Sequence, residues 1–238
     1  KPAIVELSDH LIAPLDYDMA CEVHQYARSQ GLDLILKNGV QAVEPAPDGS
    51  LRVRLNNGAL DADLVILSVG VRPDTALAKA AGLELTAKGC IVVDGHMRTS
   101  APGVYAVGDA VQVTDPVTGQ PGFVPLAGPA NKQGRIAADN ICGIASEYKG
   151  TQGSSVLKVF GMTVAMTGVN ERAAKAAGLD HDKMYTFNNS HAAYYPGASG
   201  ISMKVLYEKA TGRILGAQLV GFEGVDKRCD VLATAIRA

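Results

Sequence analysis

The chain has 238 residues, of which 47% are hydrophobic and 19% charged, so it carries enough apolar material for a folded core. Its 22 basic and 24 acidic residues give a net charge of −2, which offers no reason to expect a nucleic-acid partner. No apolar run approaches the roughly 18 residues of a membrane span, and no secretory signal opens the chain. The composition predicts a cytoplasmic protein with no nucleic-acid or membrane partner.

The cysteines and histidines are scattered along the chain. Cys21, Cys90, Cys142 and Cys229 form no C-x-x-C pair, and the five histidines form no local cluster. We therefore expect no metal site, and we expect the four thiols to be reduced and mostly buried.

The first third of the chain predicts part of a parallel α/β sheet. Residues 3–7 are an apolar run typical of a strand, and residues 16–30 have the periodicity of an amphipathic helix that ends at Gly31. Residues 32–36 predict the next strand. Two alternating runs, around Val43 and at 51–55, predict further short strands joined by a turn.

The middle of the chain opens with an apolar, β-branched run at 64–69, which is typical of a strand covered on both faces and which ends at Gly70. The elements expected after it are a short helix at 75–81, strands at 91–93 and 104–107, a loop at 116–125 and a helix at 129–142. Gly128 is the predicted N-cap of that last helix, and Pro129 its first residue.

The last third predicts an α+β domain after a Gly- and Ser-rich linker at 148–155. The elements expected here are strands at 156–160, 163–168, 184–189, 202–207 and 214–220, a helix at 170–177 with Asn170 as N-cap, and a helix at 225–237.

Residues 99–110, TSAPGVYAVGDA, carry the sharpest local signal. A short apolar strand runs into Gly108, which lets another group approach the backbone closely, and Asp109 then emerges at the end of the strand. Such a carboxylate can accept hydrogen bonds from sugar-like hydroxyls. Taken alone, the Gly-Asp pair would also suit an ordinary β-turn.

The segment PLAGPA at 125–130 predicts a helix N-terminus. Its free N–H groups and the positive end of the helix dipole suit a developing negative charge. Alone, this feature would equally fit a capped surface helix.

Together with the strand that ends at Gly70, these pieces resemble the FAD-binding half of the pyridine nucleotide–disulfide oxidoreductases. The resemblance implies that Asp109 binds the flavin ribitol and that Gly108 allows its close approach. It further implies that Leu126, Ala127 and Gly128 lie near flavin N1 and O2. Gly70 would correspond to the glycine that ends the strand linking the NAD and FAD domains.

The start of the chain is similar to the second strand of the family's NAD domain, and Glu6 would bind the adenosine ribose hydroxyls. On the residues alone, Glu6 could equally be a solvated residue at a strand end. The resemblance implies an α/β fold with parts of two nested Rossmann-like domains: NAD(P)-binding at 1–64 and FAD-binding at 65–150. An α+β interface domain follows at 151–238.

The interface domain resembles that of the CoA-disulfide reductases and NADH oxidases through the segments KVFGMT, HAAYYPGA and GFEGVDKR. The whole chain is most similar to the group formed by these enzymes and the NADH peroxidases. In the CoA-disulfide reductases, a tyrosine of the YYPG stretch reaches the partner subunit's CoA site. This implies a substrate role for Tyr194 first and Tyr195 second. Adjacent tyrosines in a strand would point to opposite faces, and packing at the interface is the alternative role.

The resemblance implies a homodimeric enzyme that passes hydride from NAD(P)H through FAD to a cysteine-based disulfide or sulfenate. The acceptor beyond it would be CoA disulfide, another thiol disulfide, a persulfide, peroxide or oxygen. The catalytic cysteine and the glycine-rich dinucleotide motifs are expected outside this chain. The alternatives are a dimerisation or scaffold fragment without catalysis, and a ferredoxin-reductase-like flavoprotein.

Overall fold

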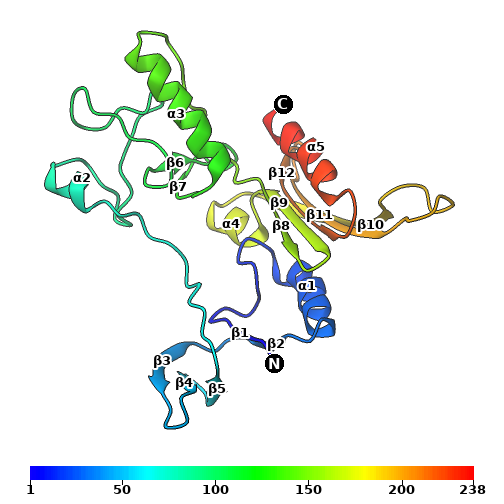
Figure 1. Ribbon diagram of the computed structural model, residues 1–238. Helices are drawn as coiled ribbons and strands as arrows, with labels where there is room; N and C mark the ends of the chain where they lie inside the picture. The colour runs from blue at the N-terminus through cyan, green and yellow to red at the C-terminus, as the bar shows by residue number, and fades with distance from the viewer. The chain divides into compact units, whose positions relative to one another are not determined.

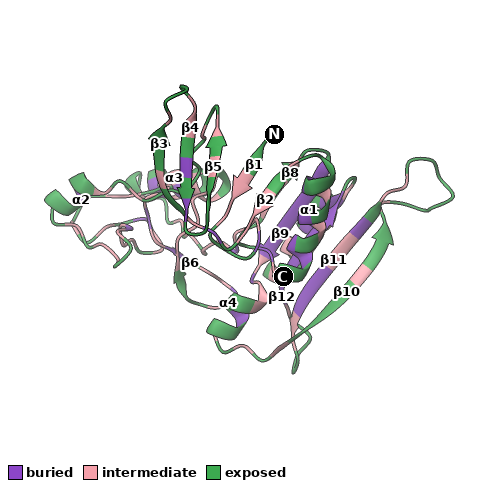
Figure 2. Ribbon diagram, turned by 90° about the horizontal axis from the view of Figure 1, so that it is seen from below, coloured by how far each residue is buried: buried purple, intermediate pink, exposed green.

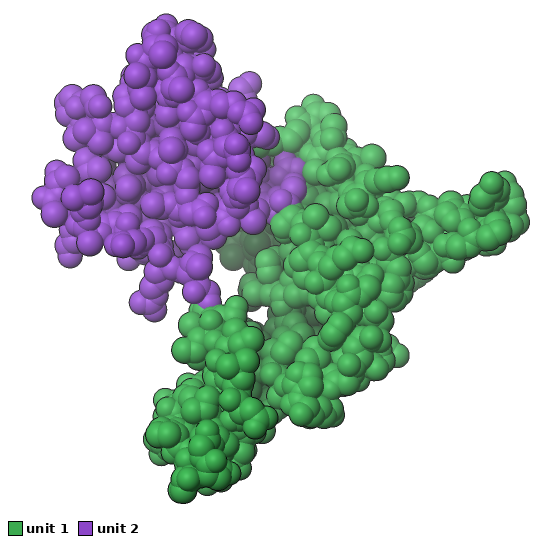
Figure 3. Space-filling model, viewed as in Figure 1, with its two compact units in different colours: residues 1–69, 155–238 green, residues 70–154 purple.

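The computed structural model describes residues 1–238. Its residues divide into two compact units, one formed by 1–69 with 155–238 and the other by 70–154 (Figure 3). Each unit contains both helices and strands, as predicted for a mixed α/β architecture. No helix is both long and apolar enough to cross a membrane.

The first unit begins with the predicted strand–helix–strand segment. Strands β1 (Ala3–Val5) and β2 (Asp33–Ile35) pair in parallel, with Ile4 opposite Leu34. Helix α1 (Tyr17–Ser29) connects them, and Gly31 follows its end at φ 90°. The left-handed conformation of that glycine explains why the helix stops there.

A three-stranded antiparallel sheet follows, built from β3 (Val40–Pro45), β4 (Leu51–Leu55) and β5 (Ala59–Ala62). The first two strands match the predicted alternating runs. The Asn-Asn-Gly turn at 56–58 reverses the chain into the third.

The largest sheet is antiparallel, in the order β10-β11-β12-β9-β8. Its strands are β8 (Ser155–Val159), β9 (Met162–Gly168), β10 (His181–Asn189), β11 (Gly200–Glu208) and β12 (Ile214–Gly221). Helices α4 (Glu171–Ala176) and α5 (Val225–Arg237) complete the domain, and Asn170 caps α4 by accepting the Ala173 N–H. Every strand and helix predicted for the last third is present.

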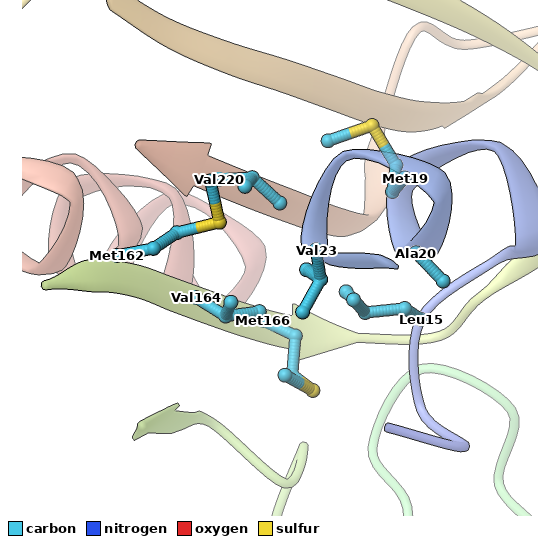
Figure 4. Close-up of a cluster of buried hydrophobic side chains, with 8 residues drawn as sticks. All are labelled: Leu15, Met19, Ala20, Val23, Met162, Val164, Met166 and Val220. Atoms are coloured by element: carbon cyan, nitrogen blue, oxygen red, sulfur yellow. The ribbon is translucent and has the colours of Figure 1, made fainter. Parts of the chain in front are cut away.

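Two helices cover the two faces of this sheet. One core cluster joins α1 to one face and consists of Leu15, Met19, Ala20, Val23, Met162, Val164, Met166 and Val220 (Figure 4). The other joins α5 to the alternate residues of the same strands, among them Ala165 and Leu219. This two-residue alternation follows from the strand pleat. Strand β10 at the edge is largely exposed, whereas its neighbour β11 is buried along much of its length (Figure 2).

The second unit contains α2 (Ala76–Ala80), α3 (Ala127–Ile141) and a hairpin of β6 (Val113–Thr114) and β7 (Pro121–Gly122). The strands expected at 91–93 and 104–107 are reduced to isolated bridges, Ile91 to Val111 and Arg98 to Tyr105. The linker predicted at 148–155 contains no helix or strand up to residue 154, and Ser155 already begins β8.

Helix α3 begins earlier than predicted. Leu126 is its N-cap, so Gly128 and Pro129 lie inside the first turn instead of at the cap and first position. The difference has a simple cause. The N–H groups of the first turn have no intrahelical acceptor, so proline is tolerated beyond the first position.

The predicted strand at 64–69 is wrong for this structure. The segment has no strand partner, and Leu64, Ile66 and Val69 are 75%, 80% and 89% exposed. An apolar run becomes a strand only when another strand satisfies its backbone groups, and no other strand of the chain pairs with it.

Candidate functional site

The Gly108–Asp109 turn lies in the second unit, just after the bridge at Tyr105. Gly108 has φ 86°, a left-handed conformation that favours glycine, and its carbonyl accepts the Val111 N–H at 3.3 Å. The Ala110 carbonyl then accepts the Ile91 N–H at 2.8 Å. Asp109 is exposed, and its carboxylate has no hydrogen-bond partner within the chain. The turn therefore presents a carboxylate that is free to accept hydrogen bonds.

The N-terminus of α3 presents donors without acceptors. Leu126 is extended, at φ −133° and ψ 146°, and offers no side-chain cap. The first intrahelical bond runs from the Ala130 N–H to the Leu126 carbonyl at 3.2 Å. The N–H groups of Ala127 and Gly128 have no acceptor in the chain, and Pro129 has no N–H. Ala127 and Gly128 are both exposed, and a Cβ added at Gly128 would meet nothing within 4 Å, so the space beside Gly128 is open.

Gln133, which the sequence analysis did not single out, connects the turn and the helix. Its Oε1 accepts the Gly108 N–H at 2.8 Å, and the residue is 1% exposed. Gln133 and Ala137 are the buried residues of α3, four positions apart. The sequence could have indicated this role, because Gln133 is a polar residue on the face of the helix that is otherwise suited to burial.

These groups suit a flavin nucleotide. The Asp109 carboxylate can accept hydrogen bonds from hydroxyls, and the N–H groups of Ala127 and Gly128 can donate to an electron-rich carbonyl. The positive end of the α3 dipole favours negative charge at that point. Donors, acceptor and open approach thus fit the hydroxyl chain and ring carbonyl of FAD.

Gly70 is placed differently. It has φ 94° and lies in the exposed segment that follows residues 64–69, with nothing within 4 Å of an added Cβ. No hydrogen bond joins it to the Asp109 turn.

Glu6 lies in the other unit, directly after β1. Its N–H donates to the Ile35 carbonyl at 2.9 Å, and its Oε1 accepts the Ser8 N–H at 2.8 Å. It therefore stands at the carboxyl end of a parallel strand pair, where dinucleotides bind in α/β sheets.

Tyr194 and Tyr195 lie in the loop between β10 and β11, which extends beyond the end of the sheet (Figure 1). They are 90% and 67% exposed, and the ring of Tyr195 makes an edge contact with His191. The expectation that both belong to a strand is wrong. The Tyr195 N–H bonds to the Ala192 carbonyl at 2.9 Å, a local turn that replaces cross-strand pairing.

A buried charge cluster in the first unit was also missed from the sequence. Lys204 on β11 is fully buried, and its Nζ lies 2.9 Å from Asp16, 2.9 Å from Asp18 and 2.5 Å from Glu171. Burial alone would lower the pKa of Lys204, but hydrogen bonds to the three carboxylates outweigh it and raise that pKa. The sequence could have indicated this cluster, because Lys204 occupies an inward-facing position in an otherwise apolar strand.

The partners of Lys204 are themselves well bonded. The Asp16 carboxylate accepts hydrogen bonds from Gln218 at 2.6 Å and from the Glu171 N–H at 3.1 Å. Tyr185 donates to Asp18. The cluster joins the start of α1 to α4 and β11 and leaves Lys204 no access to solvent.

The cysteines are all free, and only half of them are buried. Cys90 and Cys229 are buried, whereas Cys21 and Cys142 are exposed, so the expectation of mostly buried thiols is wrong. Burial raises the pKa of Cys229 to about 11, which makes that thiol a poor nucleophile.

Comparison with known families gives two adjacent matches. Residues 2–134 match the family model described as pyridine nucleotide-disulphide oxidoreductase. Residues 154–238 match the dimerisation domain of the same group.

Individual relatives agree with these matches. An NADH oxidase of Methanocaldococcus jannaschii is 32% identical over 98% of the chain and 52% of its own length. A coenzyme A disulfide reductase of Staphylococcus aureus is 30% identical over 99% of the chain and 52% of its own length. The crystal structure of reduced CoADR-RHD from Bacillus anthracis is 44% identical, with a TM-score of 0.94, over 99% of the chain and 42% of that protein.

These likenesses confirm the predicted fold class, in which Rossmann-like parts precede a dimerisation domain. The chain spans about half the length of the curated relatives it matches.

Proposed function

Because the chain belongs to the pyridine nucleotide-disulphide oxidoreductase family, as its motifs predicted, we propose that it is part of an FAD-dependent NAD(P)H oxidoreductase. FAD and NAD(P)H are the cofactors of this family. We assign residues 1–64 to NAD(P) binding, 65–150 to FAD binding and 151–238 to the interface domain.

The observation that carries this proposal is the pairing of an unpartnered carboxylate with unpartnered helix donors in one unit. Asp109 accepts hydrogen bonds from the ribityl hydroxyls, and the left-handed Gly108 keeps side-chain atoms out of their way. The N–H groups of Ala127 and Gly128 face flavin N1 and O2, supported by Leu126 as N-cap. Gly70 lies at the start of the FAD-binding part, and no hydrogen bond joins it to these groups.

When bound, FAD supplies a ring that takes a hydride from NAD(P)H and passes electrons to a cysteine-based centre. The chain's own contribution is to bind and polarise that ring. The α3 N–H groups and the helix dipole would stabilise negative charge on the edge of the ring that they face.

Glu6 provides the contact to NAD(P)H in this proposal. Its position after β1 lets the carboxylate accept hydrogen bonds from the adenosine ribose hydroxyls. An acidic residue at that place disfavours a 2′-phosphate, so NADH is the preferred donor.

The interface domain forms a homodimer in this proposal, and the β10–β11 loop gives Tyr194, with Tyr195 second, to the other subunit's substrate site. The support is a dimerisation-domain match over 154–238 and two tyrosines exposed at the end of the sheet. The terminal acceptor is CoA disulfide or a related thiol disulfide, persulfide, peroxide or oxygen. The names of the relatives, a coenzyme A disulfide reductase and an NADH oxidase, favour the first and the last.

A cytoplasmic location is part of the same proposal. All four cysteines are free, which is the usual state in a reducing compartment.

The test uses the purified full-length protein. We expect flavin absorbance at about one FAD per chain, a dimer by light scattering and NADH-dependent reduction of CoA disulfide. A protein without flavin that still dimerises would support the scaffold alternative. A flavin-containing monomer would support the ferredoxin-reductase-like alternative.

A further inference from the structure

Gln133 is the one α3 residue with a buried side-chain polar atom that has no hydrogen-bond partner. It is 1% exposed, its Oε1 accepts the Gly108 N–H at 2.8 Å, and its Nε2 is buried without a partner. The bond also fixes the orientation of the amide, because the Gly108 N–H requires the oxygen atom as its acceptor.

A buried amide with unused donors costs stability, so this residue is poorly explained by packing alone. An apolar side chain of similar length would fill the same space without unpartnered atoms. The feature that an apolar residue could not supply is the bond from Oε1 to Gly108. That bond acts directly on the residue before Asp109, whose carboxylate has no other constraint within the chain.

We infer that Gln133 is a positioning residue for flavin binding, which holds the Gly108–Asp109 turn against α3 so that Asp109 and the helix N-terminus address the same ligand. The inference rests on the proposed FAD site and adds to it the residue that sets its geometry. The Gly108 peptide is anchored from the helix side. Without that bond, Asp109 samples orientations in which its carboxylate turns away from the ligand.

The test compares FAD dissociation constants of the full-length apoprotein in three variants. Gln133→Met removes the acceptor and keeps the length, and we expect about tenfold weaker FAD binding with little change in apoprotein melting temperature. Gln133→Glu keeps an acceptor oxygen at the same place, and we expect binding within about threefold of wild type. Asn140→Ala removes another α3 amide, one that bonds only to the Ile136 and Ser146 carbonyls, and should leave FAD affinity unchanged.

Rescue by glutamate but not by methionine separates positioning from general helix stability. Wild-type FAD affinity in Gln133→Met would overturn this inference alone. An equal loss in Gln133→Met and Asn140→Ala would also overturn it, by showing that any damage to α3 weakens binding. If Gln133→Met does not fold, a tenfold loss in folded Gln133→Glu would have the same effect. A wild-type protein without FAD would overturn the proposed function as well.

Discussion

The Lys204 cluster and the Asp109 turn are both built from charged and polar groups, yet they are bonded in opposite ways. Around Lys204, three carboxylates, a tyrosine hydroxyl and an amide share hydrogen bonds within the chain. Around Asp109, the carboxylate and two helix N–H groups have no partners within the chain, and all are exposed. A closed polar network serves the fold, whereas exposed groups without partners are available to a ligand.

Because of this difference, we expect substitutions in the Lys204 cluster to change stability and substitutions at the Asp109 turn to change ligand binding. Lys204 joins segments more than 30 residues apart in sequence, from α1, α4 and β11, so its loss should loosen the first unit. The Asp109 carboxylate has no hydrogen-bond partner in the chain, so its removal should leave the fold intact and weaken only ligand binding.

The largest expected effect is therefore on stability, at Lys204. Replacing it with methionine leaves the Asp16, Asp18 and Glu171 carboxylates near one another without their shared cation. We expect the free energy of unfolding in urea to fall by about 3–5 kcal/mol. Lys183, which pairs with Glu171 at the surface, is the matched control, and Lys183→Met should cost less than about 1 kcal/mol. Equal losses in the two variants would contradict a special role for the buried lysine.

Acid should weaken the same cluster. Burial alone would raise the pKa values of Asp18 and Glu171, but hydrogen bonds from Tyr185, Lys183 and Lys204 lower both below their ordinary values of 3.8 and 4.5. A carboxylate with a lowered pKa in the folded state contributes stability that is present above its ordinary pKa and lost as pH falls through the folded value. The stability difference between wild type and Lys204→Met should therefore shrink below about pH 4. Urea titrations across the acid range measure it, and a pH-independent difference would refute the prediction.

The next effect is on binding, at Asp109. Asp109→Ala removes a charge-assisted acceptor, and we expect the FAD-binding free energy to weaken by about 1.5–3 kcal/mol with unchanged unfolding. Glu84→Ala removes another exposed carboxylate of the same unit and serves as the control. Flavin content after purification gives the first measurement. An Asp109→Ala protein as yellow as wild type would remove Asp109 from the site.

A smaller effect is expected at the exposed loop. Tyr194→Phe removes one hydroxyl, and the apparent KM for CoA disulfide should rise about two- to tenfold, while NADH oxidation by artificial acceptors is unchanged. Tyr195→Phe, at the neighbouring position, should have the smaller effect of the two. If neither variant changes CoA-disulfide kinetics, the loop is a packing or surface element.

The smallest effect concerns the potential of the flavin. A leucine at Gly128 would crowd the open N–H groups of α3 and weaken their interaction with the reduced ring. We expect a midpoint potential lower by about 10–20 mV, or weaker FAD binding. Gly134→Leu, six residues further along α3 and equally unobstructed, is the control. Normal potential and normal FAD content in Gly128→Leu would mean that the helix start does not face the flavin.

Sequence patterns predicted the elements whose signals are local. The alternating runs of β4 and β9, the Asn170 cap of α4 and the Gly31 end of α1 all depend on residues close together in the chain. The strand at 64–69 failed because its formation needs a partner strand, which no local pattern supplies.

The site shows the same limit. Gly108, Asp109 and the α3 N-terminus could be proposed as site residues from the sequence because each lies in a short motif. Gln133 and Lys204 were missed because their roles depend on partners 25 and up to 188 residues away in the sequence. The exact start of α3 was also missed, since proline in the first turn is compatible with more than one position.

The contrast between the two regions is tested most directly by calorimetric titration of FAD into the full-length apoprotein. The titration compares the wild type with Asp109→Ala and with Lys204→Met, at a temperature where all three are folded. We expect Asp109→Ala to raise the FAD dissociation constant about 10- to 150-fold, whereas Lys204→Met should leave it near the wild-type value despite its lower stability. Wild-type affinity in Asp109→Ala, or an equal loss of affinity in both variants, would contradict this expectation.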